Sequence, residues 1–329
     1  MSKINRRGLR ITVAAVAAGA AAVAGSALAA SAQAAPLASA NSHYRYTTLN
    51  NQHDVTFNQL LGINNHNQIA GYFGSGAAGH PNKGYLLLPP YTQHSYVNEN
   101  FPGSAQTQVV GLNDNGVSVG FWAPTNLGSG DANHGFYVKN GRAHNADFPT
   151  HSPASPVFDQ LLGVNDSNVA VGVYNDAAGT AHGYEYNISN GHFAAVTDPH
   201  APSTSLTAAG INNHGDVAGF YTNPANGNTD GFLKEGGRFT DLAFPGASST
   251  MATGVNDKDE VVGFYMVGSG SSALSHGFTW TPSHGFTTVD DPNGLGATAL
   301  NGVNNAGDLV GFYTDGAGNT DGFLATPRS

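Results

Sequence analysis

The chain has 329 residues, among them 44 glycines, 17 phenylalanines and 13 tyrosines, but no cysteine. The missing cysteine excludes disulfides, zinc–thiolate sites and cysteine nucleophiles. Charged residues make up only 10% of the chain, while glycine and aromatic residues recur at fixed places, which favours an all-β protein over a disordered one.

Residues 1–34 have the pattern of a bacterial secretory signal peptide. The basic head "MSKINRRGLR" precedes the apolar stretch "ITVAAVAAGAAAVAGSALAA", and two A-x-A sites end at Ala29 and Ala34. We expect cleavage near residue 34, a short linker at 35–42, and a secreted or periplasmic mature protein. The pair Arg6-Arg7 raises the twin-arginine route as an alternative to the general export route.

Removing the signal peptide changes the electrostatics of the chain. It leaves 8 basic and 22 acidic residues, a net charge of −14 with histidine neutral. Such a chain repels phosphate backbones and anionic lipid surfaces, so neither nucleic acid nor a membrane is an expected partner.

One short phrase, G-[ILV]-N-[ND]-x-[GND], occurs six times in residues 43–329, at intervals of 44 to 52 residues. A second glycine follows the first by nine residues in every copy. The first glycines are Gly62, Gly111, Gly163, Gly210, Gly254 and Gly302. A fixed phrase at variable intervals indicates a repeat architecture with tolerant loops.

Each phrase predicts a tight hairpin between two strands. The sixth position holds glycine, asparagine or aspartate, the residues that best tolerate positive φ. The third position is always asparagine, which can fold its side chain onto the backbone two residues further on. We therefore assign a structural turn role to Asn64, Asn113, Asn165, Asn212, Asn256 and Asn304.

Two further short strands follow each phrase, except that the sixth copy ends after its third strand. The missing strand matches residues 44–51, "YRYTTLNN", which resemble residues 285–292, "GFTTVDDP". We predict an all-β fold, a six-bladed β-propeller at 43–329 with four-stranded antiparallel blades, closed when the N-terminal strand pairs with the last blade. An open solenoid is the alternative.

The repeat resembles the HAF-repeat family of bacterial extracellular proteins. The resemblance is carried by the six phrases, by the aromatic residues after the second glycine, and by the third-strand starts His134-Gly135-Phe136 and His276-Gly277-Phe278. The tripeptide departs from the family name, because glycine replaces alanine throughout. The resemblance implies secretion and a repeat fold, and no established activity.

The loops between the second and third strands are the predicted binding surface, because function concentrates on loops that a rigid scaffold positions. Aromatic planes beside amides suit sugar or peptide ligands. The candidate ligand-binding residues are Trp122, Tyr221, Asn223, Asn226 and Asn228.

Other polar groups have weaker patterns. We predict no metal site, because a solvated turn explains Asp257, Asp259 and Glu260 better than the alternative, a calcium site. The third-strand residues are histidine in three copies, His134, His182 and His276, but repeat symmetry spaces them too far apart for one metal ion. Asp290 and Asp291 are adjacent and would point to opposite faces of a strand, so no acid–base pair is predicted.

The sequence therefore favours a secreted, non-enzymatic propeller that binds a polysaccharide, a cell-surface component or an extracellular protein. A hydrolase or lyase acting on a polymer, and a purely structural repeat protein, are the alternatives. No catalytic residue and no cofactor are predicted, and a monomer is expected.

Overall fold

The computed structural model describes residues 43–126, 132–198, 204–268 and 273–328. The signal peptide and linker predicted for residues 1–42 lie outside these ranges. Within them the chain consists of β-strands and one short 3-10 helix, η1 (Gln93–Ser95). In this part of the chain no helix is long and apolar enough to span a membrane.

Strand β1 (Tyr44–Thr48) precedes the first phrase, and the copies follow in order. Copy 1 contributes β2 (Asn58–Ile63), β3 (Ile69–Phe73), β4 (Lys83–Leu87) and β5 (Tyr96–Asn98). Copy 2 contributes β6 (Gln106–Leu112), β7 (Ser118–Ala123), β8 (His134–Lys139) and β9 (Arg142–Asn145). Copy 3 contributes β10 (Asp159–Val164), β11 (Val169–Asn175), β12 (Ala181–Asn187) and β13 (His192–Val196).

The later copies repeat this order. Copy 4 contributes β14 (Leu206–Ile211), β15 (Val217–Thr222), β16 (Thr229–Glu235) and β17 (Arg238–Leu242). Copy 5 contributes β18 (Ser249–Val255), β19 (Val261–Val267), β20 (Leu274–Thr281) and β21 (Gly285–Thr288). Copy 6 contributes β22 (Thr298–Val303), β23 (Leu309–Thr314) and β24 (Thr320–Pro327).

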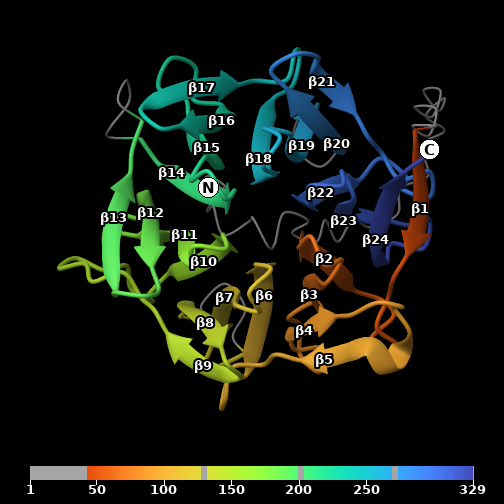
Figure 1. The fold of residues 1–329 in the computed structure, drawn as a ribbon, viewed down its shortest axis with the longest axis horizontal. Helices are drawn as coiled ribbons and strands as arrows, with labels where there is room; N and C mark the ends of the chain where they lie inside the picture. Colours follow the sequence, from red (N-terminus) through yellow and green to blue (C-terminus); the bar gives the residue numbers. More distant parts are fainter. Residues whose placement is uncertain (1–42, 127–131, 199–203, 269–272, 329) are drawn as a thin grey trace, which may run out of the picture.

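The strands of each copy pair antiparallel in sequence order, and the sheets lie around a common centre (Figure 1). Four sheets have four strands, whereas the strands of copies 4 and 5 are joined in one sheet of eight. That junction is one parallel residue pair, Thr229 with Ser249. Equivalent parallel bridges, such as Phe57 with Thr320, link other neighbouring copies. No sheet of the described residues closes on itself through strand pairing.

The pairing predicted for the N-terminal strand is present. Strand β1 pairs antiparallel with β24, with Tyr44 opposite Pro327 and Thr48 opposite Phe323. Beyond the strand, the Leu49 amide donates to the Gly322 carbonyl over 2.8 Å. The Asn50 side chain donates to Asp321 Oδ1 over 2.6 Å. The first strand thus completes a four-stranded sheet with the last copy.

The phrase forms the predicted hairpin in all six copies. Its sixth residue has positive φ throughout, from 58° at Asn168 to 86° at Gly215. The sequence pattern did not reveal a second irregularity, a register shift in each first strand just before the first glycine. In copy 1 this shift lies between Leu60 and Gly62.

The first glycine of each phrase allows neighbouring copies to approach backbone to backbone. A Cβ on Gly62 would meet the Val110 carbonyl oxygen at 2.7 Å, so only glycine fits there. A Cβ on Gly302 would meet the Gly62 Cα at 3.0 Å, so copy 6 packs against copy 1 in the same way. The innermost strands therefore lie in contact around the central axis.

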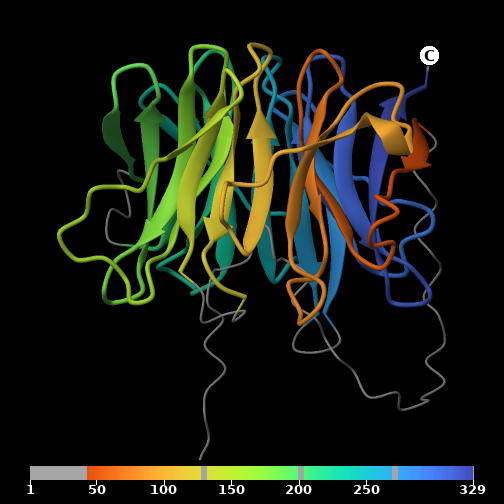
Figure 2. The same cartoon turned by 90° about the horizontal axis from the view of Figure 1, so that it is seen from below.

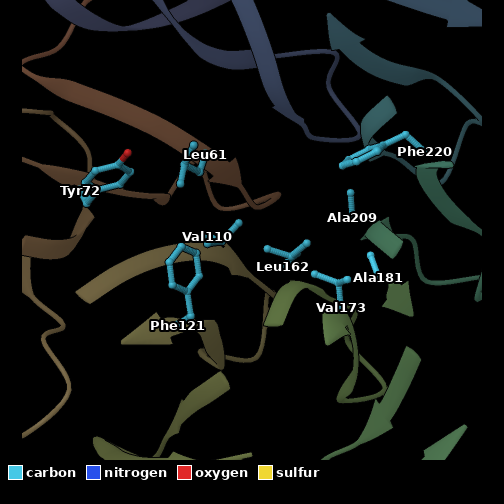
Figure 3. Close-up of a cluster of buried hydrophobic side chains, with 9 residues drawn as sticks. All are labelled: Leu61, Tyr72, Val110, Phe121, Leu162, Val173, Ala181, Ala209 and Phe220. Atoms are coloured by element: carbon cyan, nitrogen blue, oxygen red, sulfur yellow. The ribbon is translucent and has the colours of Figure 1, made fainter. Parts of the chain in front are cut away.

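Apolar side chains from neighbouring copies fill the space between the sheets. One cluster joins Leu61, Val110, Leu162 and Ala209, contributed by the first strands of copies 1 to 4 (Figure 3). Figure 2 shows the sheets standing side by side with their strands running between two faces. We call the face with the phrase hairpins the turn face, and the opposite face, with the loops between second and third strands, the loop face.

Candidate functional site

The third-position asparagines have the predicted turn role and a further one. Each side-chain oxygen accepts from the amides two and four residues further on, as Asn64 does from His66 (3.0 Å) and Gln68 (2.9 Å). Each side-chain nitrogen donates to the carbonyl of the corresponding asparagine in the next copy, at 2.8 to 3.4 Å. The last of these bonds runs from Asn304 back to Asn64.

The fourth position of the phrase forms a second ring, which we call the axial ring. Each of its side chains accepts a hydrogen bond from the backbone N–H of the fourth-position residue in the preceding copy, at 2.8 or 2.9 Å. The ring lines an open hollow of about 370 Å³ on the turn face. Its members are Asn65, Asp114, Asp166, Asn213, Asp257 and Asn305. The constant Asn or Asp at this position was the sequence signal for the ring.

Both oxygens of each carboxylate in the axial ring accept hydrogen bonds from other members of the ring. Asp257 accepts the Asn213 amide over 2.8 Å and the side chains of Asn213 and Asn305 over 3.1 and 2.7 Å. Burial acts to raise the pKa of Asp257, but these hydrogen bonds outweigh it and hold the pKa below its ordinary value. The ring is thus explained as a structural junction between copies.

The structure does not bring the three candidate calcium ligands together. Asp257 belongs to the axial ring, and Glu260 accepts from Asn256 Nδ2 over 3.2 Å. Asp259 lies instead near His214 and Asp216, the one metal-compatible group that the described residues contain. All three of these side chains are exposed or half-buried, and no further observation points to an ion there.

The candidate ligand residue Trp122 is half-buried, and other side chains of the protein contact both its ring and its nitrogen. Its ring stacks on Phe101 at a centroid distance of 4.3 Å and on His134 at 5.0 Å. Its Nε1 donates to Asn145 Oδ1 over 2.9 Å. Trp122 lies in β7 and Tyr221 in β15, so the structure places them in separate sheets.

The other candidate residues belong to copy 4, with Tyr221 near the end of β15 and the three asparagines in the loop that follows. Tyr221 is only 4% exposed and donates to Asp241 over 3.0 Å. The Asn223 side chain donates to Asp230 over 2.7 Å, and Asn226 accepts the Asn228 amide over 2.8 Å. These contacts account for the shape of the loop without a ligand, and the binding role of the five residues stays a prediction.

Three copies carry a matching stack of aromatic rings on the loop face. A phenylalanine from the connection between copies stacks on the aromatic residue that ends the second strand, at 3.6 to 4.3 Å. The third-strand histidine stacks on the same ring at 5.0 to 5.3 Å. The stacks are Phe101–Trp122–His134, Phe148–Tyr174–His182 and Phe244–Tyr265–His276.

The three histidines differ in their carboxylate partners. In copies 2 and 5, Nδ1 of the histidine bonds an aspartate from the end of the fourth strand, His134 to Asp147 at 2.8 Å and His276 to Asp290 at 2.7 Å. In copy 3, His182 Nε2 bonds Asp176, from the loop between second and third strands, at 3.0 Å. Each histidine therefore holds one carboxylate, as the sequence reading of satisfied polar groups expects.

A hollow opens beside the stack of copy 3 and reaches the first strand of copy 4. We call it the copy-3 groove. Rings, an imidazole and hydroxyls line it: Phe148, Tyr174, His182, Thr197, Thr204 and Leu206, with Asp198. Apolar ring surface beside hydrogen-bonding groups is the composition typical of small-ligand sites. Thr197 and Leu206 depart from the residues at the equivalent positions of most other copies, and this departure is the sequence signal that could have found the groove.

One of the residues that line this groove departs from the repeat. Four residues before the first glycine, five copies have a polar side chain that accepts a backbone amide from the connection. These are Asn58, Thr107, Asp159, Thr250 and Thr298. In copy 4 the position is Leu206, which lines the groove and accepts no hydrogen bond.

Asp159 is the charged member of that set. Its carboxylate is 2% exposed, accepts the Phe148 amide over 2.7 Å and accepts the hydroxyl of the buried Tyr184. Burial raises the pKa of Asp159 to about 7, although both hydrogen bonds act in the opposite direction. Asp159 lies behind the groove rather than in it, so we assign it to stability.

The histidines and aspartates of the loop face bond one another in pairs, one pair to a copy. Asp290 bonds His276 and the Gly277 amide, whereas the buried Asp291 accepts the Asn293 amide over 2.8 Å. Burial, together with the charge of Asp321, raises the pKa of Asp291. The histidine–aspartate pairs lie one to a copy, in different sheets, so they do not face a common substrate position.

No family model and no curated protein matches the chain. Among solved structures, AofleA from Arthrobotrys oligospora is 13% identical, with 87% of this chain and 84% of that one covered and a TM-score of 0.46. The Aleuria aurantia lectin in complex with Fucα1-6GlcNAc is 11% identical over 82% and 91%, with a TM-score of 0.47. A polysaccharide lyase, ulvan lyase, is 11% identical over 82% and 80%, with a TM-score of 0.44. Similarity at this level says nothing about what this chain binds.

Proposed function

We propose that this chain is a secreted, non-enzymatic β-propeller that binds carbohydrate in the copy-3 groove. The observation that carries the proposal is the groove's wall, where the Phe148–Tyr174–His182 stack borders a hollow beside the Thr197 and Thr204 hydroxyls. Sugars present apolar C–H faces and hydroxyl edges together, and such a wall complements both.

The proposal includes six blades closed into a ring, with β1 as the fourth strand of the last blade. Three observations support closure: the β1–β24 pairing, the Gly302–Gly62 approach, and the asparagine bond from Asn304 to Asn64. A closed ring holds the two sides of each groove between blades at a fixed separation, and a rigid site keeps the entropy cost of binding low.

Export, monomeric state and membership of the HAF-repeat family also belong to the proposal. The basic head, apolar stretch and A-x-A sites of residues 1–34 support export. Mass spectrometry of the protein from the culture medium should find a new N-terminus near residue 35. Light scattering of the same sample should give the mass of one chain.

Carbohydrate binding is tested with the mature protein on a glycan array, followed by calorimetry with the retained glycans. The variant His182→Ala should weaken binding about tenfold or more, the effect of losing one well-placed polar and stacking contact. The control variant His134→Ala removes the equivalent ring of copy 2, which lies outside the copy-3 groove, and should bind as the wild type does. If the folded protein retained no glycan on the array, the proposal of carbohydrate binding would be refuted.

A further inference from the structure

The end of the fourth strand follows one rule in four of the six copies. An aspartate or asparagine there accepts the amide of the third-strand glycine with its side-chain oxygen, at 3.0 or 3.1 Å. The pairs are Asn100 with Gly84, Asp147 with Gly135, Asp290 with Gly277 and Asn50 with Gly322. In the two copies with histidine and aspartate, the second carboxylate oxygen bonds the imidazole.

Copy 3 has the histidine but lacks the aspartate. The residue that corresponds to Asp147 and Asp290 is Thr197, because each follows the residue opposite the third-strand glycine. Thr197 is exposed and lines the groove, and the strand pairing continues through Gly183 and Val196. His182 turns its Nε2 to Asp176, and its Nδ1 has no hydrogen-bond partner among the described residues.

We propose that the copy-3 groove receives the carboxylate of a uronic acid residue, at the place beside the imidazole that the chain's own aspartate fills in copies 2 and 5. This inference rests on the proposed function and narrows it. Copies 2 and 5 show the expected carboxylate–imidazole contact, since Asp147 and Asp290 bond the histidine of an equivalent ring stack at 2.8 and 2.7 Å. A ligand carboxylate makes the same charge-assisted bond to His182.

The surrounding charge limits the kind of acidic glycan. Asp198 also lines the groove, although it is only 4% exposed, and Asp176 holds the other nitrogen of His182. The chain without residues 1–34 carries a net charge of −14, which repels a long polyanion. The ligand is therefore an isolated uronate in an otherwise neutral glycan, held by short-range contacts.

The test compares methyl glycosides that differ only at carbon 6. Methyl glucuronide, galacturonide and mannuronide are titrated into the mature protein by NMR, beside methyl glucoside, galactoside and mannoside. At least one uronide should bind about tenfold or more tightly than its neutral counterpart, as one charge-assisted hydrogen bond requires. Equal affinities would overturn the inference and leave carbohydrate binding intact, whereas no binding by any of the six would overturn both.

Two variants separate the site from general effects of charge. Thr197→Asp places the chain's own carboxylate beside His182, as in copies 2 and 5, and should reduce uronide affinity about tenfold or more with an unchanged melting temperature. Ala243→Asp adds the same charge at the corresponding exposed position of copy 4, where the third strand has Asp230 in place of the histidine, and should leave the affinity unchanged. A Thr197→Asp protein that binds uronide as the wild type does would overturn the inference.

Discussion

Replacing Asp159 by asparagine should stabilise the protein above neutral pH and leave it little changed in acid. The folded state holds the Asp159 proton more tightly than the unfolded state, because burial raises the pKa from 3.8 to about 7. Between these two values the folded protein binds more protons than the unfolded chain. The free energy of unfolding therefore falls as the pH rises through this window, and the loss is complete above about pH 7.

The size of the effect follows from the pKa shift. A shift of about 3 pH units at 1.36 kcal/mol per unit corresponds to about 4 kcal/mol of lost stability at alkaline pH. Asparagine retains an oxygen for the Phe148 amide and a nitrogen that can donate to the Tyr184 hydroxyl. Copy 1 shows that the side chain fits, since Asn58 accepts the Asn51 amide at the equivalent position over 2.9 Å.

The assay is urea unfolding from pH 4 to pH 9, followed by the fluorescence of Trp122 and Trp280. The wild type should lose stability across this range, and Asp159→Asn should lose less, so that the two curves separate by up to about 4 kcal/mol at the alkaline end. The reciprocal variant Asn58→Asp should steepen the loss. Parallel wild-type and Asp159→Asn curves over the whole range would refute the reasoning.

Three further changes test other parts of the structure. Deleting residues 43–51 exposes the edge of β24 and removes the Asn50 side chain that donates to Asp321. Calorimetry should find a free energy of unfolding about 5 kcal/mol lower than that of the mature protein. An equal melting temperature would contradict the role of β1. Asn304→Ala removes the side-chain oxygen that accepts the Ala306 and Asp308 amides, together with the bond to Asn64, at a cost of about 2 to 4 kcal/mol in urea unfolding. The exposed control Asn226→Ala should stay within about 0.5 kcal/mol. The lowered pKa of Asp257 stabilises the fold while the carboxylate is ionised, and this stabilisation disappears when the group is protonated. Asp257→Asn should therefore reduce the fall in the free energy of unfolding as the pH drops below about 4. An unchanged pH dependence in acid would show that the axial ring carries no such charge effect.

The sequence predicted the parts of this fold that rest on local chemistry. Positive φ at the sixth position and the asparagine turn bonds follow from the residue types alone, and both are present in all six copies. The β1–β24 pairing followed from matching two incomplete ends of one repeat. The amide link from each asparagine to the next copy could not be predicted, because one copy alone does not define where its neighbour's carbonyl lies.

The candidate site was harder to predict, because a side chain's availability depends on what packs against it. The Trp122 ring is of the type on which sugars stack, but Phe101 and His134 stack on it and its Nε1 donates to Asn145. Sequence reasoning counted aromatic residues in loops, whereas the structure shows which rings the connections between copies already cover.

A repeat protein offers a more reliable signal than residue type, namely the place where one copy departs from a rule that the others obey. Five copies accept a connection amide four residues before the first glycine, and copy 4 has Leu206 there. Four copies end the fourth strand with an Asn or Asp on a glycine amide, whereas copy 3 has Thr197 and copy 4 has Ala243. Thr197 and Leu206 are 9 residues apart in the chain and line the same hollow. Other copies fold with the standard residue at each position, so the fold itself requires neither Leu206 nor Thr197, and the proposed function assigns both residues to the groove.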